Sequence, residues 1–339
     1  MEDTDRIAGI DVAAKDFAVW VDELGTEILS TTYPNSIEGI NACIAAIAEA
    51  GLDPGTVLFC MEHTGVYAET LCYVLREKGL RVSLVAPHKV KRSVDDPRHK
   101  TDLLDSRRLV EYARRYADRL LPWEPNAVVV EQINVLLRTR DQLVKQNVAS
   151  SNLLKTLRRK WIQTPAANDT LERTIAVLKT EIKNLERQIR QLIKDNPTLS
   201  HGVSLLLSVP GVGLIAAANL LVLTSGFTAH YTYRQTAAYL GIAPRPYESG
   251  ATVRGGTHTR GYGPSALRKV LHMSVRSAQR CNKQQRAYFL RKKAEGKPGR
   301  VVLNNLANKQ LRVMLAVLQN GQPYNRAYRS INPALLTLP

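Results

Sequence analysis

The first 85 residues alternate between short apolar runs and longer stretches with helical periodicity. The short β-branched or apolar runs predict strands at 6–12, 16–22, 26–33, 56–61 and 80–85, and the periodic stretches predict helices at 37–50 and 66–78. Three successive strands indicate an antiparallel meander, and the helix-strand-helix-strand order after them indicates a mixed sheet flanked by helices. A polar stretch at 92–100 leads into one more helix at 101–117. The pattern predicts an α/β domain that ends near residue 125.

From residue 126 the pattern becomes that of long helices. Apolar residues recur at alternating steps of four and three, which is the a/d spacing of a coiled coil: Leu171, Ile175, Leu178, Ile182, Leu185, Ile189 and Leu192. Asp169 to Glu172 predicts a capping box at the start of this helix, and Asn196-Pro197 predicts its end. With a second helix at 128–161 and a turn at 163–168, the sequence predicts an antiparallel hairpin. Its apolar seam suits packing within one chain and dimerisation equally well.

Residues 201–339 predict a second, mainly helical domain. Val209-Pro-Gly-Val-Gly213 separates two short apolar stretches, a pattern typical of a helix-hairpin-helix, in which the backbone N–H groups of Gly211 and Gly213 contact a phosphate. A plain connection between helices is the alternative. The predicted fold class is α/β plus all-α, with domains at 1–125, 126–200 and 201–339.

Positive charge is concentrated toward the C-terminus. The 339 residues carry a formal charge of +17, with −6 in residues 1–100, +6 in 101–200 and +17 in 201–339. Glu248 and Glu295 are the only acids in the last range, whereas ordinary surfaces mix the two signs. This excess predicts a nucleic acid as partner, with an acidic protein or a membrane surface as the alternative. The basic segments 138–160 and 276–300 are the candidates for backbone contact.

Composition and cysteine spacing exclude several other classes. At 44% apolar residues the chain buries ordinary cores, so it is not a disordered protein. Cys43, Cys60, Cys72 and Cys281 form neither a zinc motif nor a disulfide framework, which predicts reduced thiols in a cytoplasmic protein. The best apolar run, 214–223, is shorter than the roughly 20 residues of a membrane span. No membrane partner is expected.

Four carboxylates form the first candidate site. Asp11 and Glu62 end predicted strands, while Asp102 and Asp105 share one face at the start of a predicted helix. Strands one and four of a mixed sheet can be neighbours, which would bring Asp11 and Glu62 together near that helix. Gathered carboxylates need divalent cations, and two Mg²⁺ roughly 4 Å apart suit phosphoryl transfer. Each acid taken singly is better explained as surface charge.

The second candidate site is a loop rich in glycine and arginine, at 241–268. Ser249 precedes a glycine there, so its hydroxyl could reach a phosphate whose charge arginines such as Arg254, Arg260 and Arg268 would stabilise. A turn serine that bonds its own backbone is the alternative, and Tyr247 and Tyr262 are rival nucleophiles. No general base is evident for any of the three.

Three features occur together in this chain: the acids Asp11, Glu62, Asp102 and Asp105 in this order, the segment 206–218 with its Pro-Gly-Val-Gly turn, and the block 241–268. This combination resembles the DEDD transposases of the one-ten class of bacterial insertion sequences. That family joins a RuvC-like, ribonuclease-H-type domain to a helical transposase domain bearing a serine. By resemblance, the four acids would bind Mg²⁺, or Mn²⁺, and Ser249 would attack DNA to form a phosphoserine link.

The resemblance also implies partners. A structured bridge RNA from the element would pair with donor and target DNA, and dimers would pair into tetramers with composite sites, near the nucleoid of a bacterial cytoplasm. One departure stands out: the family's usual Gly-Asn ahead of Leu-Arg is Gly263-Pro264 here, and proline lacks an N–H donor. The alternatives are a metal-dependent nuclease or junction resolvase with a structural Ser249, and a nucleic-acid-binding scaffold without activity.

Overall fold

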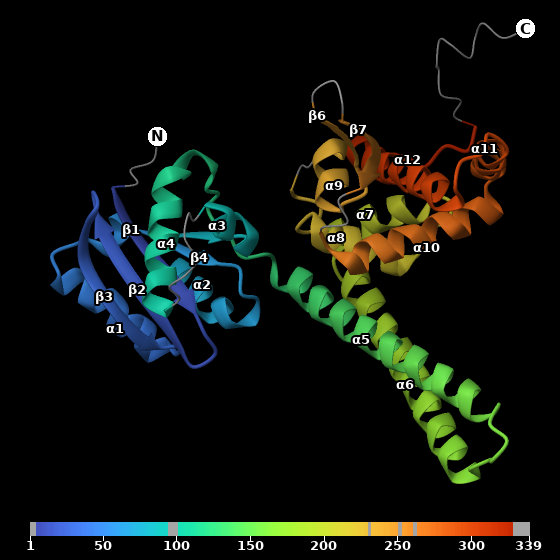
Figure 1. Cartoon of the computed structure of the whole chain (residues 1–339), viewed down its shortest axis with the longest axis horizontal. Coiled ribbons are helices and arrows are strands. Elements are labelled where there is room, and N and C mark those ends of the chain that lie inside the picture. Colours follow the sequence, from blue (N-terminus) through green and yellow to red (C-terminus); the bar gives the residue numbers. More distant parts are fainter. Residues whose placement is uncertain (1–4, 94–100, 230–231, 250–252, 260–262, 328–339) are drawn as a thin grey trace, which may run out of the picture. The chain divides into compact units, whose positions relative to one another are not determined.

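The computed structural model describes residues 5–93, 101–229, 232–249, 253–259 and 263–327 (Figure 1). The chain divides into two compact units, 1–125 and 126–339, which are described separately. The boundary lies at Pro125, where the sequence predicts the end of the α/β domain.

The first unit is built on a five-stranded sheet in the order β3-β2-β1-β4-β5. Its strands are β1 (Arg6–Val12), β2 (Asp16–Glu23), β3 (Thr26–Pro34), β4 (Leu58–Glu62) and β5 (Arg81–Val85). The first three pair antiparallel, whereas β4 lies parallel to both β1 and β5. The predicted mixed sheet is therefore confirmed, including the adjacency of strands one and four, and the order is that of a ribonuclease-H-type α/β domain.

Helices cover both faces of this sheet. On one face α1 (Ile37–Glu49) and α2 (Val66–Glu77) pack on Ile10 and Val19, and a short 3₁₀ turn, Pro54–Thr56, leads into β4. On the other face, α4 (Asp102–Arg115) packs on Ile7 and Cys60. A short helix that the sequence did not predict, α3 (Pro87–Ser93), follows β5, and the rest of the polar stretch 92–100 lies outside the described residues.

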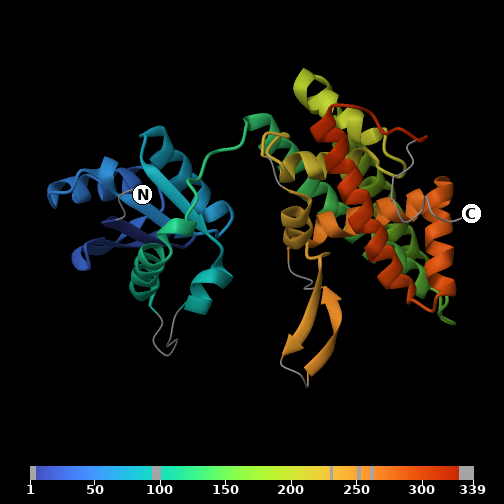
Figure 2. The same ribbon diagram turned by 90° about the horizontal axis from the view of Figure 1, so that it is seen from above.

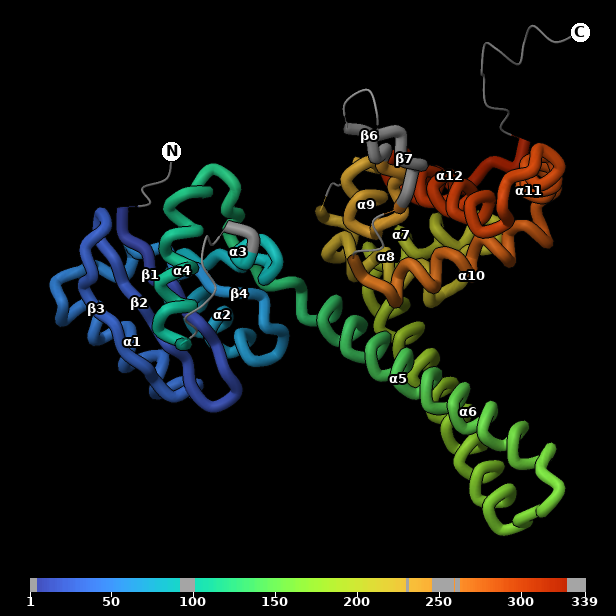
Figure 3. The backbone as a smooth tube through the Cα atoms, viewed as in Figure 1, coloured from blue at the N-terminus to red at the C-terminus, as the bar shows by residue number. Residues whose placement is uncertain are grey.

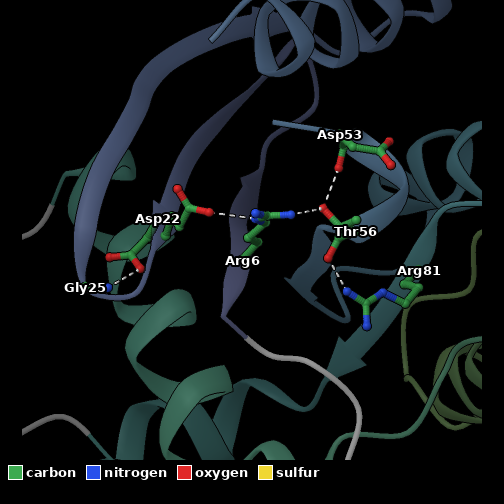
Figure 4. Close-up of polar contacts among 7 residues, drawn as sticks. Arg6, Asp22, Gly25, Asp53, Thr56 and Arg81 are labelled. Atoms are coloured by element: carbon green, nitrogen blue, oxygen red, sulfur yellow. Dashed lines mark hydrogen bonds and ion pairs between the residues drawn. The ribbon is translucent and has the colours of Figure 1, made fainter. Parts of the chain in front are cut away.

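The polar groups where the sheet begins form a network of their own (Figure 4). The Arg6 guanidinium donates to Glu23 Oε1 at 2.7 Å and to Thr56 Oγ1 at 3.0 Å. Thr56 Oγ1 in turn donates to the Asp53 carbonyl at 2.7 Å, and Arg81 donates to the Thr56 carbonyl. These bonds join the starts of β1 and β5 to the turn before β4. They fix the ends of the strands opposite to those that carry Asp11 and Glu62.

The second unit starts with the predicted antiparallel hairpin of α5 (Val128–Leu157) and α6 (Pro165–Lys194) (Figure 3). The capping box predicted at Asp169 is wrong, because α6 begins four residues earlier, with Pro165 at a first-turn position where its missing N–H costs nothing. The apolar residues of the seam face α5: Ile175 and Ile189 are buried, and Arg140 of α5 reaches Glu186 at 2.7 Å. The seam therefore packs within the chain.

The body of the second unit is helical, as predicted. Its helices are α7 (Pro197–Leu207), α8 (Leu214–Leu223), α9 (Tyr233–Tyr239), α10 (Ser265–Cys281), α11 (Lys283–Ala294) and α12 (Gly299–Asn320). One hydrophobic core joins them to the base of the α5–α6 hairpin through Ile133 and Ile189. The block 241–268 was expected to be a loop, but it contains a two-stranded hairpin of β6 (Pro244–Ser249) and β7 (Val253–Thr259) and the start of α10 (Figure 2). No described helix combines the length and apolar character needed to cross a bilayer.

Candidate functional site

Asp11 and Glu62 lie side by side at the carboxyl ends of two parallel strands. The β1–β4 register runs to Ile10 opposite Met61, so Asp11 and Glu62 are the next residues of each strand. Residues at the same register of parallel strands point to the same face of a sheet. Ile7 and Cys60, an even number of positions away, pack against α4, so the two carboxylates belong to the face that α4 covers.

The placement of α4 depends on a glycine in the middle of β1. A Cβ on Gly9 would lie 2.0 Å from the Ser106 carbonyl oxygen and 2.9 Å from the Val110 nitrogen, so only glycine allows the helix to lie this close. Arg114, near the other end of α4, forms an ion pair with Asp22, whose side chain is 8% exposed. The first turn of α4 is thereby held over the carboxyl end of β1.

That first turn carries the other two acids. Thr101 caps α4 by accepting a hydrogen bond from the Leu104 N–H at 3.2 Å, and Asp102 and Asp105 follow at positions where the helix dipole favours negative charge. Asp105 Oδ1 accepts from Arg108 at 2.6 Å, in a pair that is largely shielded from solvent. Asp11, Glu62, Asp102 and Asp105 thus belong to one end of one face of the sheet.

Oxygen donors of this kind suit a hard divalent cation. Cys60 on the same face is fully buried, and this burial, followed by the charge of Glu62, raises the pKa of its thiol to about 12. The four carboxylates are nevertheless not gathered into one cluster: within the described ranges, no three acidic, histidine or cysteine side chains are close enough to hold an ion. Donor type and placement fit a divalent metal, while the spacing seen here is wider than ligation requires.

Ser249 is the last residue of β6 and pairs with Val253 across the hairpin. The base of this hairpin is fixed to α12, because the Nδ2 atoms of Asn304 and Asn308 both donate to the Ile242 carbonyl at 3.0 Å. Asn308 Oδ1 also accepts from the Tyr233 hydroxyl at 3.0 Å. This buried carbonyl, which accepts two hydrogen bonds, thus anchors the strand that ends at Ser249.

The return of the hairpin to α10 depends on Gly263. Its φ is +98°, and a Cβ there would lie 1.9 Å from the Tyr239 carbonyl oxygen, so no other residue fits without movement of the backbone. Pro264 follows as the N-cap of α10. Because an N-cap N–H lies outside the helix, proline at this position removes no helical hydrogen bond.

The residues predicted to contact phosphate differ in what surrounds them in the structure. Gly211 packs on α10, where Ser274 Oγ donates to its carbonyl at 2.8 Å, so packing accounts for this glycine, whereas Gly213 is exposed at the N-cap of α8. Arg268 Nη1 donates to the Leu240 carbonyl at 3.0 Å. Arg254 lies in β7, and Arg260 and Tyr262 lie outside the described residues.

Two family models match the chain, one to each unit's candidate site. A model of DEDD transposases of the IS110 type matches residues 8–160, which contain all four acids, and the model described as "Transposase IS116/IS110/IS902 family" matches 203–290, which contain Ser249. The chain belongs to the IS110 family of transposases. As such it is an enzyme that cleaves and rejoins DNA.

Two relatives of this transposase match most of its length, and a third matches less than half of it. The "Pilin gene-inverting protein" of Moraxella bovis is 26% identical over 300 residues, which span 87% of this chain and 90% of the relative. The "Probable family 20 transposase" of Pseudomonas aeruginosa is 29% identical over 277 residues, 74% of this chain and 80% of the relative. An "Insertion element IS110 uncharacterized 43.6 kDa protein" of Streptomyces coelicolor is 30% identical, but over only 46% of this chain and 37% of its own length.

Sequence reasoning missed the residues that position the two parts of the site in this transposase. Gly9 stands in an ordinary strand pattern, and only the close approach of α4 gives it a role. Asn304 and Asn308 did offer a signal, because asparagine is unfavourable inside a helix, and two of them four residues apart indicate a shared tertiary partner. That partner is the carbonyl at the base of the serine hairpin.

Proposed function

We propose that this transposase recombines DNA through a phosphoserine link at Ser249, assisted by divalent metal at Asp11, Glu62, Asp102 and Asp105, and guided by RNA. The observation that carries the proposal is the placement of the acids. Asp11 and Glu62 each follow the last paired residue of the neighbouring strands β1 and β4. Asp102 and Asp105 occupy the first turn of α4, which is held over the same end of the sheet. Such an arrangement in a ribonuclease-H-type unit of a DNA-cleaving family is suited to handling a phosphodiester.

A bound Mg²⁺, or Mn²⁺, would supply a Lewis acid that neutralises charge on the phosphate oxygens. The residues that would hold it are the four acids. Of these, Asp105 is paired with Arg108, so binding there exchanges one cationic partner for another. The backbone of Asp11 is held opposite Ala18 of β2 and that of Glu62 opposite Val85 of β5, which makes these two acids the rigid half of the site.

In the proposed reaction the Oγ of Ser249 attacks phosphorus, and the bond from phosphorus to a deoxyribose oxygen breaks. The serine proton leaves to solvent, and the departing deoxyribose oxygen takes up a proton. A hydroxyl of a second DNA strand then attacks the phosphoserine and releases the serine oxygen, which regains its proton. The phosphate remains a diester at every stage, so the strands are rejoined without an external energy source.

RNA guidance and oligomeric assembly are parts of the proposal that come from the family resemblance. The charge of +17 in residues 201–339 is suited to binding more than one phosphate backbone, because such binding grows with the number of phosphates neutralised. If base pairing with the RNA selects the DNA sequence, the protein itself has to recognise only the backbone and the shape of the nucleic acids.

The test is a covalent-adduct trap with the full chain, an RNA transcribed from the flank of its element, matched donor and target DNA, and Mg²⁺. A protein-linked DNA band on a denaturing gel is expected for the wild type and for Ser265→Ala, and is expected to vanish for Ser249→Ala. Ser265 is a suitable control because it is an exposed serine at the start of α10 in the same unit. Free nicked product that survives Ser249→Ala but not Asp11→Asn would instead identify a metal-dependent nuclease.

A further inference from the structure

The turn between α5 and α6 exposes two consecutive apolar side chains. Trp161 is 99% exposed and Ile162 is 81% exposed. The other two tryptophans of the chain are packed, because Trp123 meets the Tyr73 ring edge to face at 5.3 Å and Trp20 packs on the core beneath α4. A single exposed apolar residue is ordinary, but an adjacent pair that includes a tryptophan is a candidate contact surface.

Packing within the second unit does not explain this exposed pair. The helices α5 and α6 are 30 residues long, so each extends roughly 45 Å. The core that they share with the other helices of the unit surrounds Ile133 and Ile189 at one end of the hairpin, and the turn lies at the other end (Figure 3). Among the described residues of the unit, no side chain covers Trp161.

Contacts on both sides of Trp161 close the turn. The Lys160 carbonyl accepts a hydrogen bond from the Gln163 side chain, which lies two residues beyond the ring. Across the hairpin, Arg158 at the end of α5 forms an ion pair with Glu172 of α6. The backbone that carries the ring is therefore fixed before any partner arrives, and this preorganisation lowers the entropic cost of binding there.

The charges next to the ring select the class of partner. Arg159 and Lys160 directly precede Trp161, both are exposed, and neither has an ion-pair partner among the described residues. Residues 155–173 contain five cations and two acids, so the end of the hairpin is positive. Like charges repel, which disfavours contact between the same turns of two copies. A single-stranded nucleic acid, with flat bases joined by phosphates, matches both the ring and the charge.

We propose that Trp161 is a stacking platform for an unpaired base of a single-stranded nucleic acid, with Arg159 and Lys160 at the adjoining phosphates. Bases inside a duplex are stacked on one another, so only an unpaired base offers its face to the ring. Stacking of this kind tolerates any sequence, because every base has a π-face. The inference rests on the proposed function, in which the protein handles unpaired RNA and DNA, and it gives the end of the hairpin a part in that function.

The test uses the fluorescence of Trp161 itself, in the full chain with its other two tryptophans replaced by phenylalanine. Twelve-nucleotide oligo(dT) and oligo(rU) are expected to quench this emission as they bind. An abasic oligomer with the same number of phosphates, and a blunt twelve-base-pair duplex, are expected to bind without quenching it. Tighter binding of oligo(rU) assigns the platform to RNA and tighter binding of oligo(dT) assigns it to DNA, and either result supports the proposal.

Substitutions in the otherwise native chain separate the ring from the charges. Trp161→Ala is expected to weaken oligo(dT) binding about tenfold, the equivalent of about 1.4 kcal/mol. Trp161→Phe keeps a flat ring and is expected to restore most of that loss. Val177→Ala is the control, since it truncates an apolar side chain that is 61% exposed on the same hairpin. Arg159→Gln combined with Lys160→Gln is expected to reduce the slope of log affinity against log salt by about 1.4 and to keep the quenching at saturation.

Three results would overturn the proposal: no quenching by any oligomer, equal quenching by the abasic oligomer or the duplex, or unchanged oligonucleotide binding by Trp161→Ala. If that variant also loses self-association in sedimentation velocity, the turn packs on a second copy of the chain instead. The serine adduct is measured separately. A platform that fails while the adduct forms leaves the proposed recombination intact, so the two failures are distinguishable.

Discussion

Replacing Gly9 with alanine tests how the acidic half of the site is built. The new Cβ would lie 2.0 Å from the Ser106 carbonyl oxygen, whereas ordinary contacts at a Cβ begin at 3.4 Å. The obstacle is helix backbone, so α4 has to move away by more than an ångström. Overpacking of this kind costs about 3 kcal/mol, and the loss of glycine's freedom in the unfolded chain returns up to about 1 kcal/mol. A net loss of about 2 kcal/mol is expected.

Hydrogen exchange read by mass spectrometry localises this loss to one unit. Amides of β1 and α4 in Gly9→Ala are expected to exchange about thirtyfold faster, the equivalent of roughly 2 kcal/mol, while those of α7 to α12 stay unchanged. Recombination is expected to fall as well, because Asp102 and Asp105 move with α4. Gly299→Ala is the control, since a Cβ there meets only Lys293 Cδ, at an ordinary 3.9 Å. Unchanged exchange in β1 and α4 would refute the close packing inferred for this helix.

Three further predictions concern other groups. Burial, and then the charges of Arg268 and Arg276, lower the pKa of His272 from 6.5, so the unfolded chain binds a proton at this residue more readily than the folded chain does. The free energy of unfolding is therefore expected to fall as the pH drops below 6.5, and to fall less in His272→Gln. Urea denaturation across this pH range measures the difference, with His201→Gln as control. Native-state labelling with a thiol reagent is expected to modify Cys281 alone, because the other three thiols are buried; modification of all four before unfolding would contradict the packing of the first unit. Asn308→Ala is expected to cost about 1 to 2 kcal/mol and to reduce adduct formation, since it removes one of two donors to the Ile242 carbonyl; full adduct yield would show that the hairpin needs no such anchor.

The sequence is most informative where a local pattern decides the structure. The strand at Arg6–Val12 was predicted to the residue, and the order of strands and helices was enough to place strands one and four together. The helical hairpin of α5 and α6 was also predicted, because the a/d spacing of apolar residues in α6 repeats over three heptads. The capping box at Asp169 was a wrong prediction, because a proline at the first helical position starts a helix as readily as a capping box does.

Features that depend on distant contacts could not be predicted. The hairpin of β6 and β7 is rich in glycine, proline and arginine and lacks the alternation of a strand, so tertiary anchoring decides its form. Likewise, Asp105 was predicted at the acidic site, but its pairing with Arg108 and the wide spacing of the four carboxylates depend on how α4 lies on the sheet. Cavities between helices depend on how side chains from distant elements pack together, so the spacing of residues along the sequence does not reveal them.

The measurement that tests the central claim most directly is the mass of the DNA-linked peptide recovered from a recombination reaction. After digestion of the trapped adduct, the account predicts that the DNA fragment is attached to the peptide containing Ser249, and that the adduct is absent in Ser249→Ala but present in Ser265→Ala. DNA linked to any other residue, or efficient strand exchange by Ser249→Ala, would contradict the account.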